Sequence, residues 1–147
     1  RVLHSAGRHG GALGALEECR RMGVAAGGAS HALIGETDRM FGEVLVAMGD
    51  LGGATERVDR AVRLTRVGFG PEHPRTWFAE LSMARLQTRL GRPQEALAAL
   101  ETLARHEGRG SEAPKVRWLA RGYQAEARCR MSERERAQRD AVQDGAQ

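Results

Sequence analysis

Aromatic residues are scarce in this chain, where they make up 4% of 147 residues. A core with few large rings has to be filled by Leu, Ala, Val and Met. Small apolar side chains of this kind favour close helix–helix contact over a sandwich of two sheets. No stretch of useful length alternates apolar and polar residues as a half-buried strand would. We therefore expect an all-α protein.

Cysteine and lysine are also rare. The two cysteines, Cys19 and Cys129, lie far apart and outside any C-x-x-C pair, which argues against a disulfide framework and a zinc site. Both fall among helical, small-residue positions, so we expect buried packing thiols. Lys115 is the only lysine, and the formal net charge of +4 depends on arginine. Arginine binds carboxylates and phosphates bidentately, although an Arg-rich chain is also typical of GC-rich genomes, the reading we favour.

Long apolar runs and catalytic motifs are missing as well. No run approaches the length of a membrane span and no signal peptide is visible, so we expect a cytoplasmic protein without a membrane partner. None of the motifs G-x-x-x-x-G-K-[ST], G-x-S-x-G, H-E-x-x-H or H-R-D occurs. We therefore expect no enzyme, no catalytic residue, no cofactor and no metal. The start at Arg1, without Met, favours a piece excised from a longer protein.

Three glycines, Gly7, Gly49 and Gly91, follow one another at intervals of 42 residues. Behind each of them the chain repeats a small residue, an apolar one and a small or apolar one at matching positions. These positions are Ala12, Leu16 and Cys19; Ala54, Val58 and Ala61; and Ala96, Leu100 and Leu103. Steps of four and three residues place such side chains on one helical face. A fixed period of this length predicts stacked helical units.

The glycines also predict the turns between helices. Each fits the position after a helix, where a left-handed conformation ends it, and Asp50 and Pro93 fit the start of the next helix. In a degenerate fourth unit Ser132 replaces the glycine, and Ser132-x-x-Glu135 is a capping-box pattern that predicts a helix start. Trp77 and Trp118 are 41 residues apart, which favours packing between repeats over ligand stacking.

The pattern predicts helix–turn–helix units throughout. Helices are expected at 9–23, 31–48, 51–67, 74–90, 93–107, 113–130 and 132–143, with residues 1–6 as the end of an earlier helix. The loops are expected at Gly27–Gly28, Gly68–Pro74 and Gly108–Pro114. We expect a single array over residues 1–147, about three and a half repeats, with units near 1–28, 29–69, 70–110 and 111–147.

The best-defined unit resembles a tetratricopeptide repeat. Gly70 to Thr76 reads G-P-E-H-P-R-T, Ala84 follows, and Leu90 to Leu97 reads L-G-R-P-Q-E-A-L. The 42-residue spacing is similar to the kinesin-light-chain-type subclass, in which a G-x-x-H-P-x-T linker often precedes the first helix. The resemblance implies a right-handed α-solenoid that binds proteins. Such arrays are common beside kinase, ATPase or protease domains in multidomain bacterial signalling proteins. At the linker, His73 is expected to cap or pack the turn.

The resemblance also implies a binding groove, because in this family the first helix of each unit lines the concave face. The positions that match are Glu36, Arg39, Glu43, Ala47, Phe78, Leu81, Arg85, Arg89, Leu119, Gly122, Glu126 and Arg130. Arg85 and Arg89 are four residues apart, so with Arg130 they could hold a carboxylate of an acidic peptide or partner. The alternative is a solvated face of arginines and glutamates paired within their helices.

Basic residues outnumber acidic ones between Lys115 and Arg139. This stretch could form an electrostatic footprint for nucleic acid, but its interleaved acids and few aromatic residues favour a charged cap that keeps the array soluble. Three hypotheses follow. The first is a non-catalytic module that presents a groove to a peptide or partner domain. The second is a regulatory or self-associating arm of a multidomain bacterial enzyme, and the third is nucleic-acid binding through the basic units.

Overall fold

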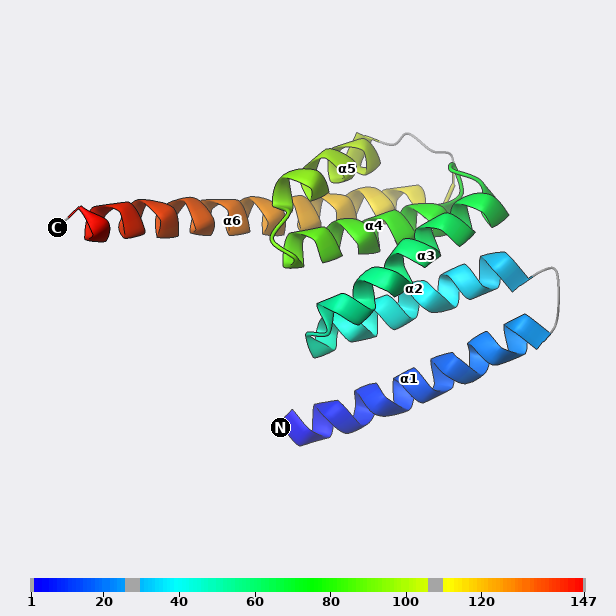
Figure 1. The fold of residues 1–147 in the computed structure, drawn as a ribbon. Coiled ribbons are helices and arrows are strands. Elements are labelled where there is room, and N and C mark those ends of the chain that lie inside the picture. Colours follow the sequence, from blue (N-terminus) through cyan, green and yellow to red (C-terminus); the bar gives the residue numbers. More distant parts are fainter. Residues whose placement is uncertain (1, 26–29, 106–109, 147) are drawn as a thin grey trace.

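The computed structural model describes residues 2–25, 30–105 and 110–146. Within them the chain forms six helices joined by turns, without a strand (Figure 1). The helices are α1 (Val2–Ala25), α2 (Ser30–Met48), α3 (Leu51–Phe69), α4 (Pro74–Arg89), α5 (Pro93–Arg105) and α6 (Ala113–Gly145). The expected loop at Gly27–Gly28 lies outside the described residues, as do residues 108–109 of the expected loop at Gly108–Pro114. Residues 110–112 form a turn, and α6 begins at Ala113.

The helices stack in chain order, each packing on the one before it (Figure 1). Two further contacts, α2 with α4 and α4 with α6, join alternate helices into an inner row. α1 and α6 do not pack on each other, so the stack is open at both ends. The prediction of an all-α stack of antiparallel helix pairs is confirmed, while the hand of the superhelix and the unit boundaries stay predictions.

Two of the three predicted glycine turns close as expected. Gly49 and Gly91 have φ of 86° and 81°, a conformation that costs glycine little. After α2 the Gly49 N–H donates to the Val46 carbonyl at 3.1 Å and the Asp50 N–H to that of Leu45 at 3.0 Å, as in a Schellman motif. The Asp50 carboxylate then accepts from the Gly53 N–H at 2.9 Å and caps α3. α5 begins at Pro93, as predicted.

The linker before α4 is held by its own polar side chains. His73 Nδ1 accepts from the Arg75 N–H at 3.2 Å and its ring stacks on Phe69, which confirms the predicted capping role. Thr76 Oγ1 donates to the Gly70 carbonyl at 2.7 Å, and the Trp77 indole donates to the Pro71 carbonyl at 3.1 Å. These bonds fix the angle at which the chain enters α4.

Two predicted helix boundaries are wrong. α1 runs without interruption through Gly7, and α6 runs as one helix through Ser132. Arg8 and His9 offer neither the capping carboxylate of Asp50 nor the proline that follows Arg92, so Gly7 stays helical at a cost of about 1 kcal/mol. Around Ser132 the sequence M-S-E-R-E-R-A-Q consists, apart from the serine itself, of strong helix formers, and no residue there favours a left-handed turn.

The repeated apolar positions of α3 and α5 form the centre of the core. Ala54, Val58, Ala61, Ala96, Leu100 and Leu103 each keep at most 4% of their surface exposed. One core cluster joins α2, α3 and α4 around Val58, and a second joins α4, α5 and α6 around Leu100 and Trp77. Burying a side chain the size of Leu100 stabilises the fold by roughly 1.5–3 kcal/mol. The packing role predicted for Trp77 is thus confirmed.

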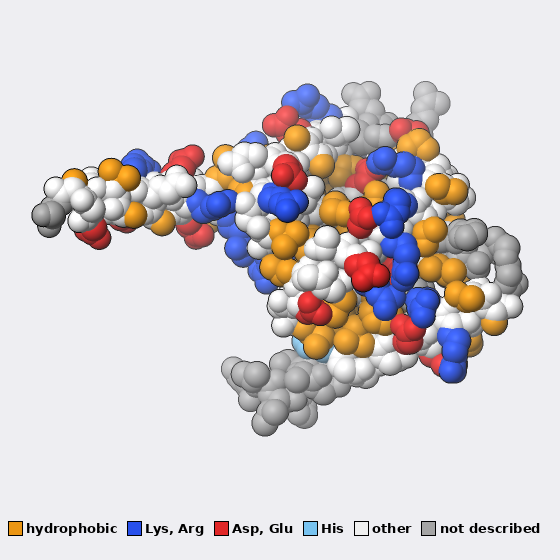
Figure 2. All heavy atoms as spheres, viewed as in Figure 1, with side chains coloured by type: hydrophobic (Ala, Val, Ile, Leu, Met, Phe, Trp, Pro, Cys, Tyr) orange, Lys and Arg blue, Asp and Glu red, His pale blue; other side chains and the backbone are white. Residues whose placement is uncertain are grey.

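The end helices break the predicted burial pattern. Trp118, the counterpart of Trp77, is 74% exposed, and the predicted packing role is wrong because no described helix follows α6 to cover it. Cys19 and Cys129 are both exposed, so the prediction of buried thiols is wrong as well. Residues 132–146 are exposed throughout, and this end of α6 projects from the body with charges of both signs along it (Figure 2).

α2 and α3 approach most closely where glycine leaves room. A Cβ at Gly42 would lie 2.2 Å from Val58 Cγ2, closer than any real contact. A Cβ at Gly68 would lie 2.7 Å from the Ala32 Cβ, and one at Gly35 would lie 3.0 Å from the Thr65 Cγ2. Only glycine fits at these three sites, because atoms of the other helix occupy the space that a side chain would need.

A Gly42→Ala substitution should destabilise the array by about 1–3 kcal/mol, because the added methyl overpacks the crossing by more than the helix propensity it gains. Chemical denaturation measures the change. Gly14→Ala is the matched control, since nothing lies within 4 Å of a Cβ there. It should be neutral or stabilise by up to about 1 kcal/mol. Equal effects of the two substitutions would contradict the close crossing.

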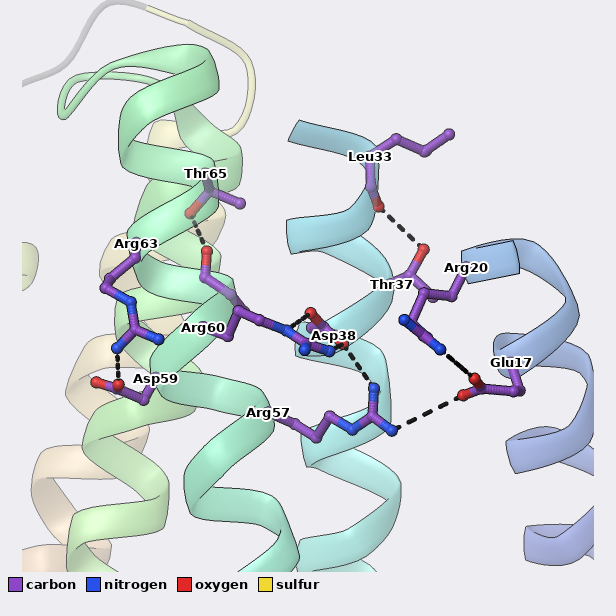
Figure 3. Close-up of polar contacts among 11 residues, drawn as sticks. Glu17, Arg20, Leu33, Thr37, Asp38, Arg57, Asp59, Arg60, Arg63 and Thr65 are labelled. Atoms are coloured by element: carbon purple, nitrogen blue, oxygen red, sulfur yellow. Dashed lines mark hydrogen bonds and ion pairs between the residues drawn. The ribbon is translucent and has the colours of Figure 1, made fainter. Parts of the chain in front are cut away.

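A buried carboxylate ties α2 to α3 (Figure 3). The side chain of Asp38 is fully buried and accepts hydrogen bonds from Arg60 Nε at 2.5 Å, Arg60 Nη2 at 2.7 Å and Arg57 Nη1 at 3.0 Å. The hydrogen bond to Asp38 raises the pKa of Arg60. Arg57 also stacks over the Phe41 ring and reaches Glu17 of α1 at 3.8 Å, while Glu17 pairs with Arg20. The network therefore extends across three helices.

An Asp38→Asn substitution should cost roughly 1–3 kcal/mol of unfolding free energy, because two guanidinium groups lose the charge to which they are bonded. Both arginines keep some solvent contact, which limits the loss. The Asp59→Asn variant is the control, since Asp59 pairs only with Arg63 on the same exposed helix face among the described residues. A similar stability loss in both variants, measured by urea titration, would count against a structural role for Asp38.

Candidate functional site

The inner row of helices encloses a cavity of about 590 Å³. α2, α4 and α6 each line it, and these are the helices that contact one another along one side of the stack. The lining side chains are those of Glu36, Arg39, Glu43, His73, Pro74, Arg75, Phe78, Leu81, Ser82, Glu112, Lys115, Leu119 and Tyr123. The cavity thus combines surfaces from three helices that are far apart in the sequence.

The floor of the cavity is apolar. Leu81 is buried, and Phe78, Leu119 and Tyr123 are partly buried against the core cluster of α4, α5 and α6. Because that cluster is packed between α4, α5 and α6, these side chains are held in place before any ligand arrives. An apolar residue of a partner that entered here would replace water on a preformed surface.

The α2 wall carries a charge network that is already satisfied. Arg39 donates to Glu36 through Nη2 at 2.6 Å and to Glu43 through Nη1 at 2.5 Å. Ser82 Oγ of α4 donates to the same Glu43 oxygen at 2.8 Å, which links the two helices across the cavity. Burial opposes the charged form of Arg39, but the hydrogen bonds and charges of Glu36 and Glu43 outweigh it and raise its pKa. Arg39 therefore stays a fixed cation between two carboxylates.

The opposite rim is more open. Lys115 lies 3.9 Å from Glu112 and 5.3 Å from the centre of the Phe78 ring. Arg75 lies over the Phe69 ring at 5.3 Å. Both cations are solvent-exposed and paired only loosely, so a ligand could displace their present contacts at little cost.

The predicted groove residues divide into two groups. Glu36, Arg39, Glu43, Phe78, Leu81 and Leu119 line the cavity, whereas Arg85, Arg89, Glu126 and Arg130 lie one to two turns further along α4 and α6. The Arg85 guanidinium lies 5.7 Å from the Tyr123 ring centre, and its buried Nε has no hydrogen-bond partner. Arg89 is exposed and without an ion pair to any described residue, while Arg130 pairs with Glu126 at 3.6 Å.

Two residues of the transferred pattern lie elsewhere. Gly122 is exposed and has nothing within 4 Å of a Cβ, so it belongs to the open face of α6. Ala47 lines a separate depression between α1 and α2.

Sequence reasoning missed His73, Arg75, Glu112, Lys115 and Tyr123 as cavity residues. His73 and Arg75 belong to the linker motif, whose pattern predicts a turn and does not show that the turn borders a cavity. Glu112 and Lys115 mark the start of α6, whose first turn faces the start of α4 across the cavity. In the sequence Lys115 is one residue of the basic stretch, and its proximity to Phe78 depends on how α4 and α6 cross.

Several titratable side chains of this set are engaged by partners within the protein. His73 uses Nδ1 to cap α4, and the carboxylates of Glu36 and Glu43 are engaged by Arg39. Among the described residues no group of three or more His, Cys, Asp or Glu side chains could hold a metal ion. Over the same residues no helix is long and apolar enough to cross a membrane.

Comparison with known proteins yields one match. The model of the tetratricopeptide repeat family matches residues 33–105, which run from α2 to the end of α5. No curated protein and no solved structure was found to match the chain. The matched stretch covers α2 from residue 33 onward and all of α3, α4 and α5. Members of this family generally serve in protein–protein interactions. Over residues 33–105 the chain is therefore similar to the tetratricopeptide repeat family. The helix pairs seen in this stretch agree with that similarity.

Proposed function

We propose that this chain is a non-catalytic module that binds a peptide or a partner domain along the row formed by α2, α4 and α6. The single observation that carries the proposal is the cavity of about 590 Å³ between these helices, with an apolar floor and charged walls. A preformed surface of this kind loses little conformational entropy when it binds.

The layout favours a ligand with two features. An apolar side chain fits the floor made by Phe78, Leu81 and Leu119. An acidic group one or two residues away along an extended peptide would reach Arg85 and Arg89 on the same face of α4. Arg89 supports this placement, since it is exposed and has no ion pair with a described residue.

The finer parts of the assignment are also proposals. The spacing of Gly49 and Gly91 and the His73–Pro74 linker support the kinesin-light-chain-type subclass. A regulatory role in a multidomain bacterial signalling enzyme, and a cytoplasmic location, rest on the resemblance alone.

Nucleic-acid binding by α6 is less favoured. Arg130 pairs with Glu126, Lys115 with Glu112, and Arg134 donates to the Gly91 carbonyl. A cation that already has a partner within the protein binds a phosphate group less favourably, because it must first give up that partner. Binding to DNA or RNA that weakened steeply with salt would revive this alternative.

The double variant Arg85→Glu/Arg89→Glu should lower the affinity for an acidic, leucine-containing peptide at least about tenfold, because two attractive cations become repulsive. Fluorescence titration against an acidic peptide and its neutral counterpart measures this loss. Only the acidic peptide should respond strongly to the substitutions.

Arg92→Glu/Arg105→Glu is the matched control, since it makes the same charge change on exposed residues away from the groove. Arg89→Glu alone tests the effect without disturbing the contact between Arg85 and Tyr123. Circular dichroism checks that all variants stay folded. An unchanged affinity in the folded double variant rejects the groove assignment.

A further inference from the structure

The two end helices each leave one face uncovered. On α6 the open face carries Trp118, Gly122, Ala125 and Cys129, all of them exposed. The corresponding residues of α4 are Trp77, Leu81, Ala84 and Thr88, all of them buried. Trp77, Leu81 and Ala84 share a core cluster with Ala96, Leu100 and Leu103 of α5. The open face of α6 is therefore the face with which α4 binds the second helix of its own pair.

The open face of α1 is the other half of the same interface. α1 carries the second-helix pattern, and its Cys19 corresponds to Ala61 and Leu103, which are 0% and 4% exposed. In α1 itself Ala15 and Cys19 are exposed and Met22 is 56% exposed. α2 covers the neighbouring side of α1 at Leu16, but no described helix covers this side.

We propose that α6 of one molecule pairs with α1 of a second copy of this chain, antiparallel and in the manner of α2 with α3. Among the described residues, no second helix packs on the open face of α6 and no first helix packs on the open face of α1. Joining them forms one more helix pair between two molecules and continues the stack.

The α2–α3 pair supplies the register. Gly42 faces Val58 at the tight crossing, and the corresponding residues across two molecules are Ala125 and Leu16. Asp38 pairs with Arg60, and the corresponding residues are Arg121 and Glu18. The charges are reversed in sign but remain opposite, so the same register brings an anion to a cation.

Both members of this intermolecular pair are accessible. Arg121 is exposed and makes no ion pair or hydrogen bond with a described residue. The Glu18 side chain is 51% exposed and pairs with Arg21 one turn away. Exposed pairs within one helix contribute little, so Glu18 can exchange its partner. Charge complementarity thus agrees with the register taken from the intact pair.

The interface is heterologous, because different surfaces of the two molecules meet. Such contacts add molecules one after another and form open chains or closed rings. A symmetric pairing of two α6 faces would instead stop at a dimer. The proposal does not depend on the groove, to which α6 contributes Lys115, Leu119 and Tyr123 and none of the residues on its open face.

Two blocking variants test the arrangement. Ala125→Arg blocks the α6 face, Cys19→Arg blocks the α1 face, and both positions are exposed, so each chain should still fold. In sedimentation velocity under reducing conditions the unmodified chain should form species larger than dimers as its concentration rises. Each variant alone should be monomeric. An equimolar mixture should form a one-to-one dimer and nothing larger, since it contains one free α6 face and one free α1 face.

Charge reversal tests the register. Arg121→Glu alone or Glu18→Arg alone should weaken self-association about two- to fivefold, and combining both in one chain should restore it. Ala137→Arg is the control for an added arginine on an exposed position of α6 outside the register, and Arg89→Glu is the control for the groove. Both controls should assemble as the unmodified chain does.

Three results would overturn the proposal. The unmodified chain could stay monomeric at high concentration, or the Cys19→Arg variant could still dimerise alone, as symmetric α6 pairing requires. The mixture of the two blocked variants could also fail to form a dimer. Circular dichroism of each variant confirms that a loss of assembly is not a loss of helix. Because Arg89→Glu alters only the groove, failure here and failure of peptide binding are distinguishable.

Discussion

The close crossing of α2 and α3 is the constraint on which the rest of the stack depends. Gly35, Gly42 and Gly68 bring the two backbones together where side chains would collide with Thr65, Val58 and Ala32. That approach buries Val58 between α2 and α4, and it brings Arg57 and Arg60 within reach of Asp38. Because α2 and α3 both contact α4, the crossing also sets the surface on which α4 packs.

The sequence predicted the interior pairs well because several local signals agreed there. At Gly49 and Gly91 a left-handed glycine, a following cap or proline and a repeated apolar stripe all point to the same turn. The predictions from the sequence failed in α1 and α6, where each depended on a single local signal. Ser132 had the capping pattern without a residue to stop the preceding helix, and Trp118 had the repeat position without a helix to cover it.

The lining of the cavity was predicted in part, and for a physical reason. The resemblance to the repeat family gives the first-helix positions expected on the concave face, and Arg39, Glu43, Phe78 and Leu81 among them do line the cavity. It does not give the crossing angles that bring Lys115 and Tyr123 to the same cavity. Nor does it show that Arg39 is engaged by two glutamates, whereas Arg85 keeps a buried donor without a partner. The clamp of three arginines expected from the sequence stays a prediction.

The central claim is an open stack in which α1 and α6 are separated by the helices between them. Spin labels on the exposed Cys19 and Cys129 test it by double electron–electron resonance, with labelled chain diluted in unlabelled chain. Successive contacts from α1 through α2 and α4 to α6, at 8–10 Å each, predict one narrow distribution at roughly 20–30 Å. A distance of about 10 Å, as between two touching helices, would show a closed bundle and contradict the account.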